Sequence, residues 1–413
     1  MREYIYQKLV WLDEKHKVLT PLKVAIDSLL WDNPQNGYCY ELSLVVGART
    51  NSSDPSSVTV MVLDSISDTF LFHQFWLANP SEASELKENL LNFTIDAANQ
   101  RNIAIFMNPI SGNRNGRDVW DQQFQPALRF TPFRYSLFET TDHEYIEEWV
   151  QNHDIKQFTD MVCLGGDGTL HLLITAIEKY YPGFLEDFKF GILPTGSTNS
   201  LACELGARSI KQGILNIIKG HSSKADLLKI KLDSQEVLST CALVWGVPSD
   251  ICNDAQNYRF LGSLRYGVVG FMKFFRKWRK YKGRLVYEND AGENVEMSID
   301  YVFVIASNHR TQNSANNEML TPFGRINDGF IDVQSMVYGS RWDIITFLRK
   351  SANKGSHTNL SFIQHFKTKS ITIEPADFPI FNIDGEIYNS SRAQVQIIPQ
   401  AIRYLGALYD DGK

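Results

Sequence analysis

Gly165-Gly166-Asp167-Gly168-Thr169 is the segment of this chain whose residue types most clearly suit catalysis. It follows an apolar run and precedes a helical pattern, so its successive backbone N–H groups can form a concave site for phosphate. The Asp167 carboxylate would repel phosphate by itself, but it can bind Mg²⁺ or accept the proton of a hydroxyl nucleophile. The alternative is a tight turn in which Asp167 is only a capping residue.

Two further turns, Asn108–Asn113 (NPISGN) and Pro194–Asn199 (PTGSTN), follow apolar runs in the same way. If these runs are parallel strands of one sheet, all three turns lie at the carboxyl edge, where ligands bind in such sheets. Neither turn matches a P-loop or a dinucleotide fingerprint. The three turns together predict one phosphate-binding crevice.

Asp384-Gly385-Glu386 lies between two apolar runs near the end of the chain. Two carboxylates around a glycine could ligate a hard cation such as Mg²⁺. The same residues also suit a hairpin turn, and residue chemistry alone favours the turn.

Residues 255–287 contain nine Lys or Arg and no Asp or Glu. Apolar residues recur within this segment at helical spacing; they are Leu264, Val268, Phe271, Phe274, Phe275, Trp278 and Tyr281. A basic amphipathic helix with aromatic residues suits an anionic membrane surface, and a solvated helix packed on the core is the alternative. Nucleic acid is a third possibility, but no nucleic-acid-binding motif accompanies the segment, so we expect no such partner.

Three parts of the chain would position these residues. Residues 1–100 carry short β-like runs, including Tyr38–Val46, Ser57–Leu63 and Thr69–Leu77, followed by a helical pattern over Pro80–Asn92. We therefore predict a β-rich N-terminal module. An arbitrary β-rich extension is the alternative.

Strand-like and helical patterns alternate over residues 101–223, which predicts a parallel sheet with right-handed crossovers. The expected strands are Ile103–Met107, Arg134–Phe138, Phe158–Leu164 and Phe188–Leu193, and the expected helices are His143–Gln151 and Thr169–Tyr181.

Residues 224–413 read as an antiparallel β-rich domain with helical insertions at about 257–281 and 340–353. Its expected strands are Leu227–Leu232, Glu236–Trp245, Arg284–Tyr287, Val295–Ile305, Gly329–Val337, Ser370–Glu374 and Ala393–Ile398.

Composition narrows the class of protein. The chain has 413 residues, a net charge of −6 and 43% hydrophobic residues, as in globular proteins of several domains. Because residues 255–287 carry +9, the remainder carries −15. Five scattered cysteines without CxxC spacing indicate neither a zinc site nor a disulfide framework. The charged N-terminal segment and the absence of a long apolar run favour a cytoplasmic, peripherally membrane-associated protein without signal peptide or transmembrane helix.

The ordered set of motifs resembles the diacylglycerol-kinase catalytic superfamily of lipid kinases, most closely its sphingosine kinase and ceramide kinase branches. The motifs are NPISGNRNG (108–116), GGDGTLH (165–171), PTGSTNSLA (194–202), WGVPSD (245–250), YRFLGSLRY (258–266), YKGRLVY (281–287) and DGE (384–386). Two positions depart from the sphingosine kinase pattern, because Gly165 replaces a Ser and Leu172 stands where a Glu is expected. One polar contact near the nucleotide is thereby in doubt.

The resemblance implies an α/β nucleotide-binding domain over 101–223, Rossmann-like and phosphofructokinase-like, followed by an antiparallel β-rich lipid-binding sandwich over 224–413. The N-terminal part, 1–100, would suit a pleckstrin-homology-like module. ATP would lie in the cleft between the two catalytic domains. The implied ATP-binding residues are Asn108, Ser111, Gly112, Gly165, Gly166, Gly168, Thr169, Thr195, Gly196, Ser197, Asn199, Arg259, Arg265, Asp384 and Gly385.

The resemblance also implies roles for three carboxylates. Asp167 would act as general base on the lipid hydroxyl, Asp250 would recognise the lipid head group, and Glu386 would be associated with Mg²⁺. The roles of Asp167 and Glu386 could be exchanged. We expect an ATP- and Mg²⁺-dependent lipid kinase acting on the primary hydroxyl of a sphingoid base. The alternatives are a ceramide or diacylglycerol kinase, and a non-catalytic lipid-binding adaptor with the same fold.

Overall fold

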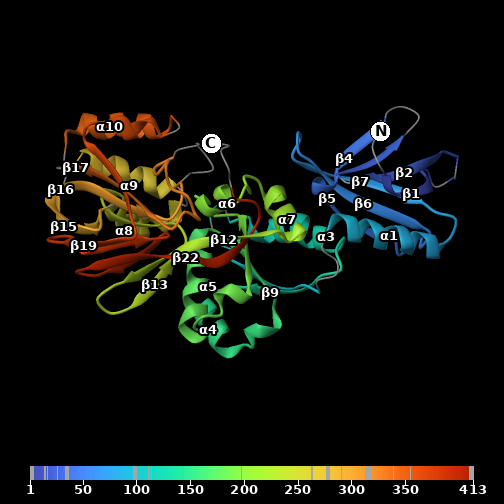
Figure 1. Cartoon of the computed structure of the whole chain (residues 1–413), viewed down its shortest axis with the longest axis horizontal. Coiled ribbons are helices and arrows are strands. Elements are labelled where there is room, and N and C mark those ends of the chain that lie inside the picture. Colours follow the sequence, from blue (N-terminus) through green and yellow to red (C-terminus); the bar gives the residue numbers. More distant parts are fainter. Residues whose placement is uncertain are drawn as a thin grey trace.

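An antiparallel sheet forms the N-terminal part of the chain (Figure 1). The computed structural model describes residues 4–13, 15, 17–25, 27–32, 37–95, 100–109, 112, 114–140, 142, 144–196, 198–261, 264–275, 280–289, 291–311, 319–337, 339–353 and 355–408. Its seven N-terminal strands pair in the order β4-β3-β2-β1-β7-β6-β5, and α1 packs on β5 and β6. These elements are β1 Tyr4–Trp11, β2 Leu19–Ala25, β3 Ser28–Asp32, β4 Gly37–Glu41, η1 Leu42–Leu44, β5 Val45–Thr50, β6 Ser57–Asp64, β7 Thr69–Trp76 and α1 Pro80–Thr94.

The prediction of a β-rich module closed by a helix is confirmed, but one predicted strand is wrong. The run 38–46 is two strands, because β4 and β5 lie at opposite edges of the sheet and the chain must leave the sheet between them. Leu42 and Val45 are nevertheless both buried. Buried apolar residues therefore continue beyond the end of β4, which gives the run the appearance of one strand in the sequence.

Four parallel strands form the centre of the molecule, in the order β9-β8-β10-β11. The predicted alternation of strands and helices is confirmed here. The strands are β8 Asn102–Met107, β9 Arg134–Glu139, β10 Asp160–Gly165 and β11 Lys189–Pro194. The helices are α2 Gly116–Val119, η2 Trp120–Phe124, α3 Gln125–Leu128, α4 Glu144–Asn152, η3 Ile155–Gln157, α5 Asp167–Tyr180, η4 Leu185–Asp187, α6 Ser200–Glu204 and α7 Ile210–Lys219.

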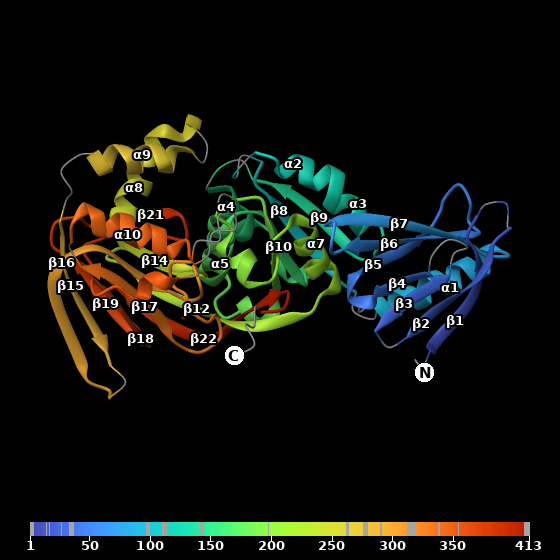
Figure 2. The ribbon, with the colours of Figure 1, turned by 90° about the horizontal axis from the view of Figure 1, so that it is seen from above.

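The C-terminal part is β-rich and mostly antiparallel, as expected (Figure 2). Its strands are β12 Ser222–Lys231, β13 Glu236–Ser239, β14 Ala242–Gly246, β15 Tyr281–Glu288, β16 Asn294–Ser307, β17 Ile331–Val337, β18 Ile363–Thr368, β19 Ser370–Pro375, β20 Ile380–Ile383, β21 Glu386–Asn389 and β22 Ala393–Leu405. Its helices are α8 Val247–Ala255, η5 Gln256–Leu261, α9 Leu264–Phe275, α10 Arg341–Ser351 and η6 Ser356–Asn359.

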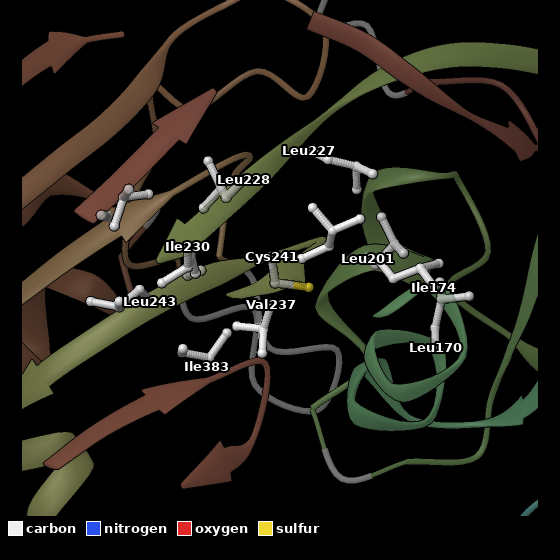
Figure 3. Close-up of a cluster of buried hydrophobic side chains, with 14 of the residues drawn as sticks. Leu170, Ile174, Leu201, Leu227, Leu228, Ile230, Val237, Cys241, Leu243 and Ile383 are labelled. Carbon is white, nitrogen blue, oxygen red and sulfur yellow. The ribbon is translucent and has the colours of Figure 1, made fainter. Parts of the chain in front are cut away.

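Strand β22 belongs to both the central and the C-terminal part of the chain. It pairs with β19 and β12 in the C-terminal part and, in parallel, with β11 of the central sheet. One buried cluster also spans the junction, with Leu170 of α5 and Leu201 of α6 facing Cys241, Ile230 and further side chains of the β-rich part (Figure 3). The sheet and the core are therefore continuous between the two parts. The boundary at residues 223 and 224 remains a prediction.

Two expectations about the C-terminal part are corrected. The run 236–245 is not one strand but β13 and β14, interrupted at Thr240 and Cys241. The basic segment is not one helix to Tyr281, because α9 ends at Phe275 and Tyr281 is a buried residue of β15. Trp278 lies outside the described residues.

Within the described part of the chain, no helix is long and apolar enough to cross a membrane. Cys163 lies fully buried in β10, and Cys203 and Cys241 are buried as well.

Candidate active site

The three glycine-containing turns meet backbone to backbone. A Cβ on Gly112 would lie 2.2 Å from the Thr195 carbonyl oxygen, and a Cβ on Gly196 would lie 2.4 Å from the Gly166 Cα. Gly112 also has a φ of +52°, which favours glycine. Because these positions have no side chains, the turns after β8, β10 and β11 can close around one point.

Local structure explains why the turns face the same way. Strands β8, β10 and β11 are adjacent and parallel, so their carboxyl ends share one edge. The Asn108 N–H donates to the Leu164 carbonyl at 3.0 Å, which extends the β8–β10 pairing to the start of the turns. Thr169 is buried behind the middle turn, with its Oγ1 2.5 Å from the position of a Cβ on Gly165. Thr169 therefore supports the shape of the turn.

Buried polar atoms at this edge lack protein partners. Thr195 Oγ1, Asn199 Oδ1 and Asn115 Oδ1 make no hydrogen bond within the part of the chain that the structure describes. Asn199 adopts a left-handed conformation, φ 55°, while its Nδ2 donates to the Gly196 carbonyl at 2.9 Å. Unpartnered buried polar atoms are rare in folded proteins, so these oxygens are available to a polar ligand. Sequence reasoning missed Asn115, although it lies within the motif 108–116.

Asp167 begins α5 and caps a different helix. Its carboxylate accepts hydrogen bonds from the N–H groups of Ser200 (2.9 Å) and Leu201 (3.2 Å) at the start of α6. Burial raises the pKa of Asp167 to about 6, the two N–H donors lower it, and the Asp384 charge raises it. A carboxylate with this pKa is ionised at neutral pH and is a better proton acceptor than an ordinary Asp.

Asp384-Gly385 forms the two-residue turn between β20 and β21, where Ile383 pairs with Glu386. Both turn residues have positive φ, 50° and 97°, as a tight hairpin of this length requires. The hairpin interpretation is therefore confirmed.

The Asp384 carboxylate lies among five donor groups of one segment. It accepts from the N–H groups of Thr240 (2.7 Å), Cys241 (3.1 Å) and Ala242 (2.9 Å) and from the hydroxyls of Ser239 (2.7 Å) and Thr240 (3.1 Å). Burial by itself raises the pKa of Asp384, but His171 and these donors hold it below its ordinary value. These hydrogen bonds account for the interruption between β13 and β14, since three N–H groups turn away from the sheet.

Glu386 lies over Gly168, next to Asp167 in the chain. Its Oε1 is 3.3 Å from the position of a Cβ on Gly168, and the Asp384 carbonyl oxygen is 3.2 Å from the same point. Gly168 therefore lets the hairpin of the C-terminal part approach the glycine turns of the central part. This approach brings Glu386 to the residue that follows Asp167 in the chain.

His171 and Tyr388 form a connection that sequence reasoning missed. His171 is fully buried in α5, with Nδ1 3.6 Å from the Asp384 Oδ2 and Nε2 2.8 Å from the Tyr388 hydroxyl. It thus links the helix that carries Asp167 to the turn and to the second strand of the β20–β21 hairpin. The spacing of four residues between Asp167 and His171, one helical turn, was the available signal.

Asp250 lies on α8, whose Ser249 hydroxyl donates to the Ile380 carbonyl of β20 at 2.9 Å. The Asp250 Oδ2 accepts from the Tyr281 hydroxyl at 2.7 Å and from the Lys273 ammonium at 2.9 Å. Sequence reasoning missed Lys273 as a partner of Asp250, because the two residues belong to different helices, α8 and α9.

Four predicted residues have no described side-chain geometry. Ser111 and Ser197 lie outside the described residues, and the side chains of Arg259 in η5 and Arg265 in α9 are not described. Gly385 has open space where a Cβ would lie, and its N–H donates to the Asn382 Oδ1 at 3.2 Å. The roles of these five residues toward ATP remain predictions.

The described residues contain no group of three or more His, Cys, Asp or Glu that could hold a metal ion by themselves. Mg²⁺ is usually held by one or two carboxylates together with phosphate oxygens and water. Glu386, whose Oε1 lies 3.3 Å from the position of a Cβ on Gly168, fits that smaller donor set.

Comparison with known families assigns both catalytic parts. Residues 102–230 match the diacylglycerol kinase catalytic domain, and residues 242–406 match the YegS C-terminal NAD kinase beta sandwich-like domain. A crystal structure of a putative diacylglycerol kinase from Bacillus anthracis has the same fold, with a TM-score of 0.58, 19% identity and coverage of 75% of this chain and 95% of that chain.

Curated relatives are lipid kinases. Sphingosine kinase 1 of Arabidopsis thaliana is 22% identical over 353 residues, covering 73% of this chain and 71% of the relative. Human ceramide kinase is 21% identical over 397 residues, covering 82% of this chain and 71% of the relative. With both domain matches in order along the chain, the protein belongs to the diacylglycerol kinase and sphingosine kinase family of lipid kinases.

Proposed function

We propose that the protein transfers the γ-phosphoryl group of ATP to the primary hydroxyl of a sphingoid base, forming sphingosine 1-phosphate from sphingosine. The observation that carries the proposal is the approach of Glu386 to Gly168, the residue after Asp167, beside three converging turns. Phosphoryl transfer requires mainly positioning and neutralisation of charge, which such a site supplies.

The proposed roles follow from chemistry at each position. Asp167 accepts the proton of the lipid hydroxyl, and its raised pKa suits that step. The N–H groups of the turns and the cations Arg259 and Arg265 hold the phosphates. Mg²⁺, held by Glu386 and phosphate oxygens, supplies neutralisation of phosphate charge. The other assignment, with Glu386 as base, is distinguished by the pH dependence described below.

Asp250 is the proposed partner of the sphingoid ammonium. Asp250→Ala should raise the KM for sphingosine at least about tenfold, because it removes a charge-assisted contact, and should change the KM for ATP little. Steady-state kinetics with each substrate varied in turn provides the measurement. Equal effects on both KM values would contradict this assignment.

Ceramide is the second candidate substrate. It has a neutral head group, and Lys273 already pairs with the Asp250 carboxylate. A human ceramide kinase is also among the relatives. A labelled-ATP assay with sphingosine, ceramide, diacylglycerol and monoacylglycerol, with separated products, tests both candidates. Absence of any labelled lipid would favour the non-catalytic adaptor.

We also propose that the protein works in the cytoplasm, at a membrane surface. Val268 and Phe271 of α9 are 40% and 67% exposed, which suits contact with lipid. The positive charge nearby is smaller than composition suggests, because Lys273, Lys280 and Arg284 all pair with carboxylates. Membrane binding should therefore depend on the apolar residues at least as much as on charge.

We also propose a more specific fold for the N-terminal sheet and for the central domain. The N-terminal sheet closed by α1 supports a pleckstrin-homology-like module. The parallel order β9-β8-β10-β11, with ligand turns at the carboxyl edge, supports a Rossmann-like, phosphofructokinase-like central domain.

A further inference from the structure

Lys273 lies between two carboxylates of α8. Its Nζ is 2.9 Å from the Asp250 Oδ2 and 2.7 Å from the Asp254 Oδ2. The side chains of Lys273 and Asp250 are only 19% and 16% exposed, whereas that of Asp254 is 43% exposed. Lys273 therefore has one inner partner and one outer partner, four residues apart on the same helix.

The inner carboxylate is fixed by the core. The Tyr281 hydroxyl donates to the Asp250 Oδ2 at 2.7 Å, and the Tyr281 ring packs edge-on against Phe378 and Trp245. Lys273 instead belongs to α9, which packs on α8 and η5 at the outer margin of the C-terminal part (Figure 2). Of the two residues that donate to Asp250, Tyr281 is fixed in the core, whereas Lys273 can move without disturbing the core.

Lys273 is charged in this arrangement. Although burial by itself lowers its pKa, the hydrogen bonds to Asp254 and Asp250 hold the pKa of Lys273 above its ordinary value. A primary ammonium with three N–H donors thus already occupies the inner carboxylate. The head group of a sphingoid base carries the same chemical group.

We propose that Lys273 is a specificity-determining residue that holds Asp250 in place of the lipid ammonium, and that it releases Asp250 and keeps only Asp254 when a cationic head group enters. This inference rests on the function proposed above and on the place given there to Asp250. Only a cationic head group such as an ammonium can replace Lys273 and still give the Asp250 carboxylate a counter-charge. A neutral amide or ester head group would leave a partly buried carboxylate without a counter-charge, which is unfavourable.

Two substitutions should act in opposite directions. Lys273→Met removes the internal competitor and should strengthen binding of a sphingoid amine about fivefold, as expected for one ion pair at the upper end of the usual range. Asp254→Asn removes the outer partner and should weaken binding of the amine, because Lys273 then has nowhere else to pair. In the Lys273→Met background, Asp254→Asn should have little further effect. Lys229→Met, which breaks the surface ion pair with Glu236, is the matched control and should change nothing.

The probe is 1-deoxysphinganine in detergent micelles, because it has the ammonium but no primary hydroxyl and is not a phosphoryl acceptor. Its N-acetyl derivative is the neutral control and should bind equally to wild type and Lys273→Met. Hydrogen exchange over residues 264–275 gives a second measurement. The amine should increase this exchange in wild type, and Lys273→Met should show the increase without ligand.

Different results would contradict the proposed kinase activity and the proposed exchange at Asp250. If no lipid is phosphorylated but the binding pattern holds, the kinase proposal fails and the exchange at Asp250 stands. If sphingosine is phosphorylated but Lys273→Met leaves the dissociation constant for the amine within about twofold of wild type, the exchange is wrong. An equal gain in affinity for the N-acetyl derivative would also overturn it.

Discussion

Asp167 is both a capping residue and a carboxylate with a raised pKa. It accepts the first N–H groups of α6, and burial raises its pKa to about 6. Each carboxylate oxygen keeps a second lone pair for another donor. The start of α6 therefore orients Asp167 without occupying it completely.

Asp167→Asn should lower kcat to below about a tenth of wild type, since an amide cannot accept the hydroxyl proton. It should not lower the melting temperature at pH 8. The raised pKa means that the protonated carboxyl favours folding below pH 3.8 and that this contribution is lost as the pH rises through about 6. At pH 8 the neutral amide thus replaces an unfavourably buried charge. ATP binding by calorimetry and thermal unfolding are the controls, and substantial retained turnover would exclude Asp167 as base.

The pH dependence of turnover separates the two carboxylates. If Asp167 is the base, kcat/KM should fall about tenfold per pH unit below pH 6 and be flat above it, because the protonated carboxyl is inactive. Glu386→Gln should lower the rate but keep this inflection. Loss of the inflection in Glu386→Gln would instead assign the base to Glu386.

At the level of elements, the site depends on the contact between turns. Gly196→Ala would place a methyl group 2.4 Å from the Gly166 Cα, so the turns after β10 and β11 must separate. A displacement of about 1 Å at a catalytic site can cost about a hundredfold in rate, and we expect kcat/KM for ATP to fall by about that factor.

The matched control is Gly37→Ala in the N-terminal sheet, where a Cβ would meet only the end of the Asp32 side chain, at 3.2 Å. That variant should keep full activity. The kinetic constants and the circular dichroism of both variants provide the test. Normal activity of Gly196→Ala would show that the turns tolerate separation.

Local pattern predicts elements well where each strand is buried between helices, as β8, β10 and β11 are. It fails where a distant contact decides the backbone. The interruption between β13 and β14 depends on Asp384, which is 144 residues from Thr240. The turn residues of the site could be predicted from the sequence for the opposite reason, because the spacing of their glycines is a local requirement of each turn. Lys273 was missed because its partner Asp250 belongs to another helix.

At the scale of the whole molecule, the N-terminal sheet is joined to the central domain by close packing. A Cβ on Gly47 of β5 would lie 2.2 Å from the Phe130 carbonyl oxygen, and the Phe130 ring contacts Phe72 and the Arg49 guanidinium. An open pocket of about 350 Å³ lies in the same interface, lined by Asp27, Glu41, Leu42, Ser43, Phe93, Thr94, Lys219 and His221. The N-terminal sheet and the central domain therefore share an interface that includes a partly polar pocket.

Lys219, the last residue of α7, donates to the carbonyl oxygens of Leu42 (2.6 Å) and Thr94 (2.7 Å) across that interface. Burial lowers its pKa from 10.5 to about 7, so the folded protein releases this proton more readily than the unfolded chain. Between these two pH values the unfolded state binds more protons, and the stability of wild type relative to Lys219→Met should rise by about 1 kcal/mol per pH unit. Denaturant unfolding of both proteins at pH 7 and pH 9 measures this difference. Lys211→Met, on the same helix and near the Asp68 carboxylate, is the control and should show no such pH dependence. A constant difference for Lys219→Met would mean that the lysine stays charged, and that the module is held by a buried ammonium rather than by a neutral amine.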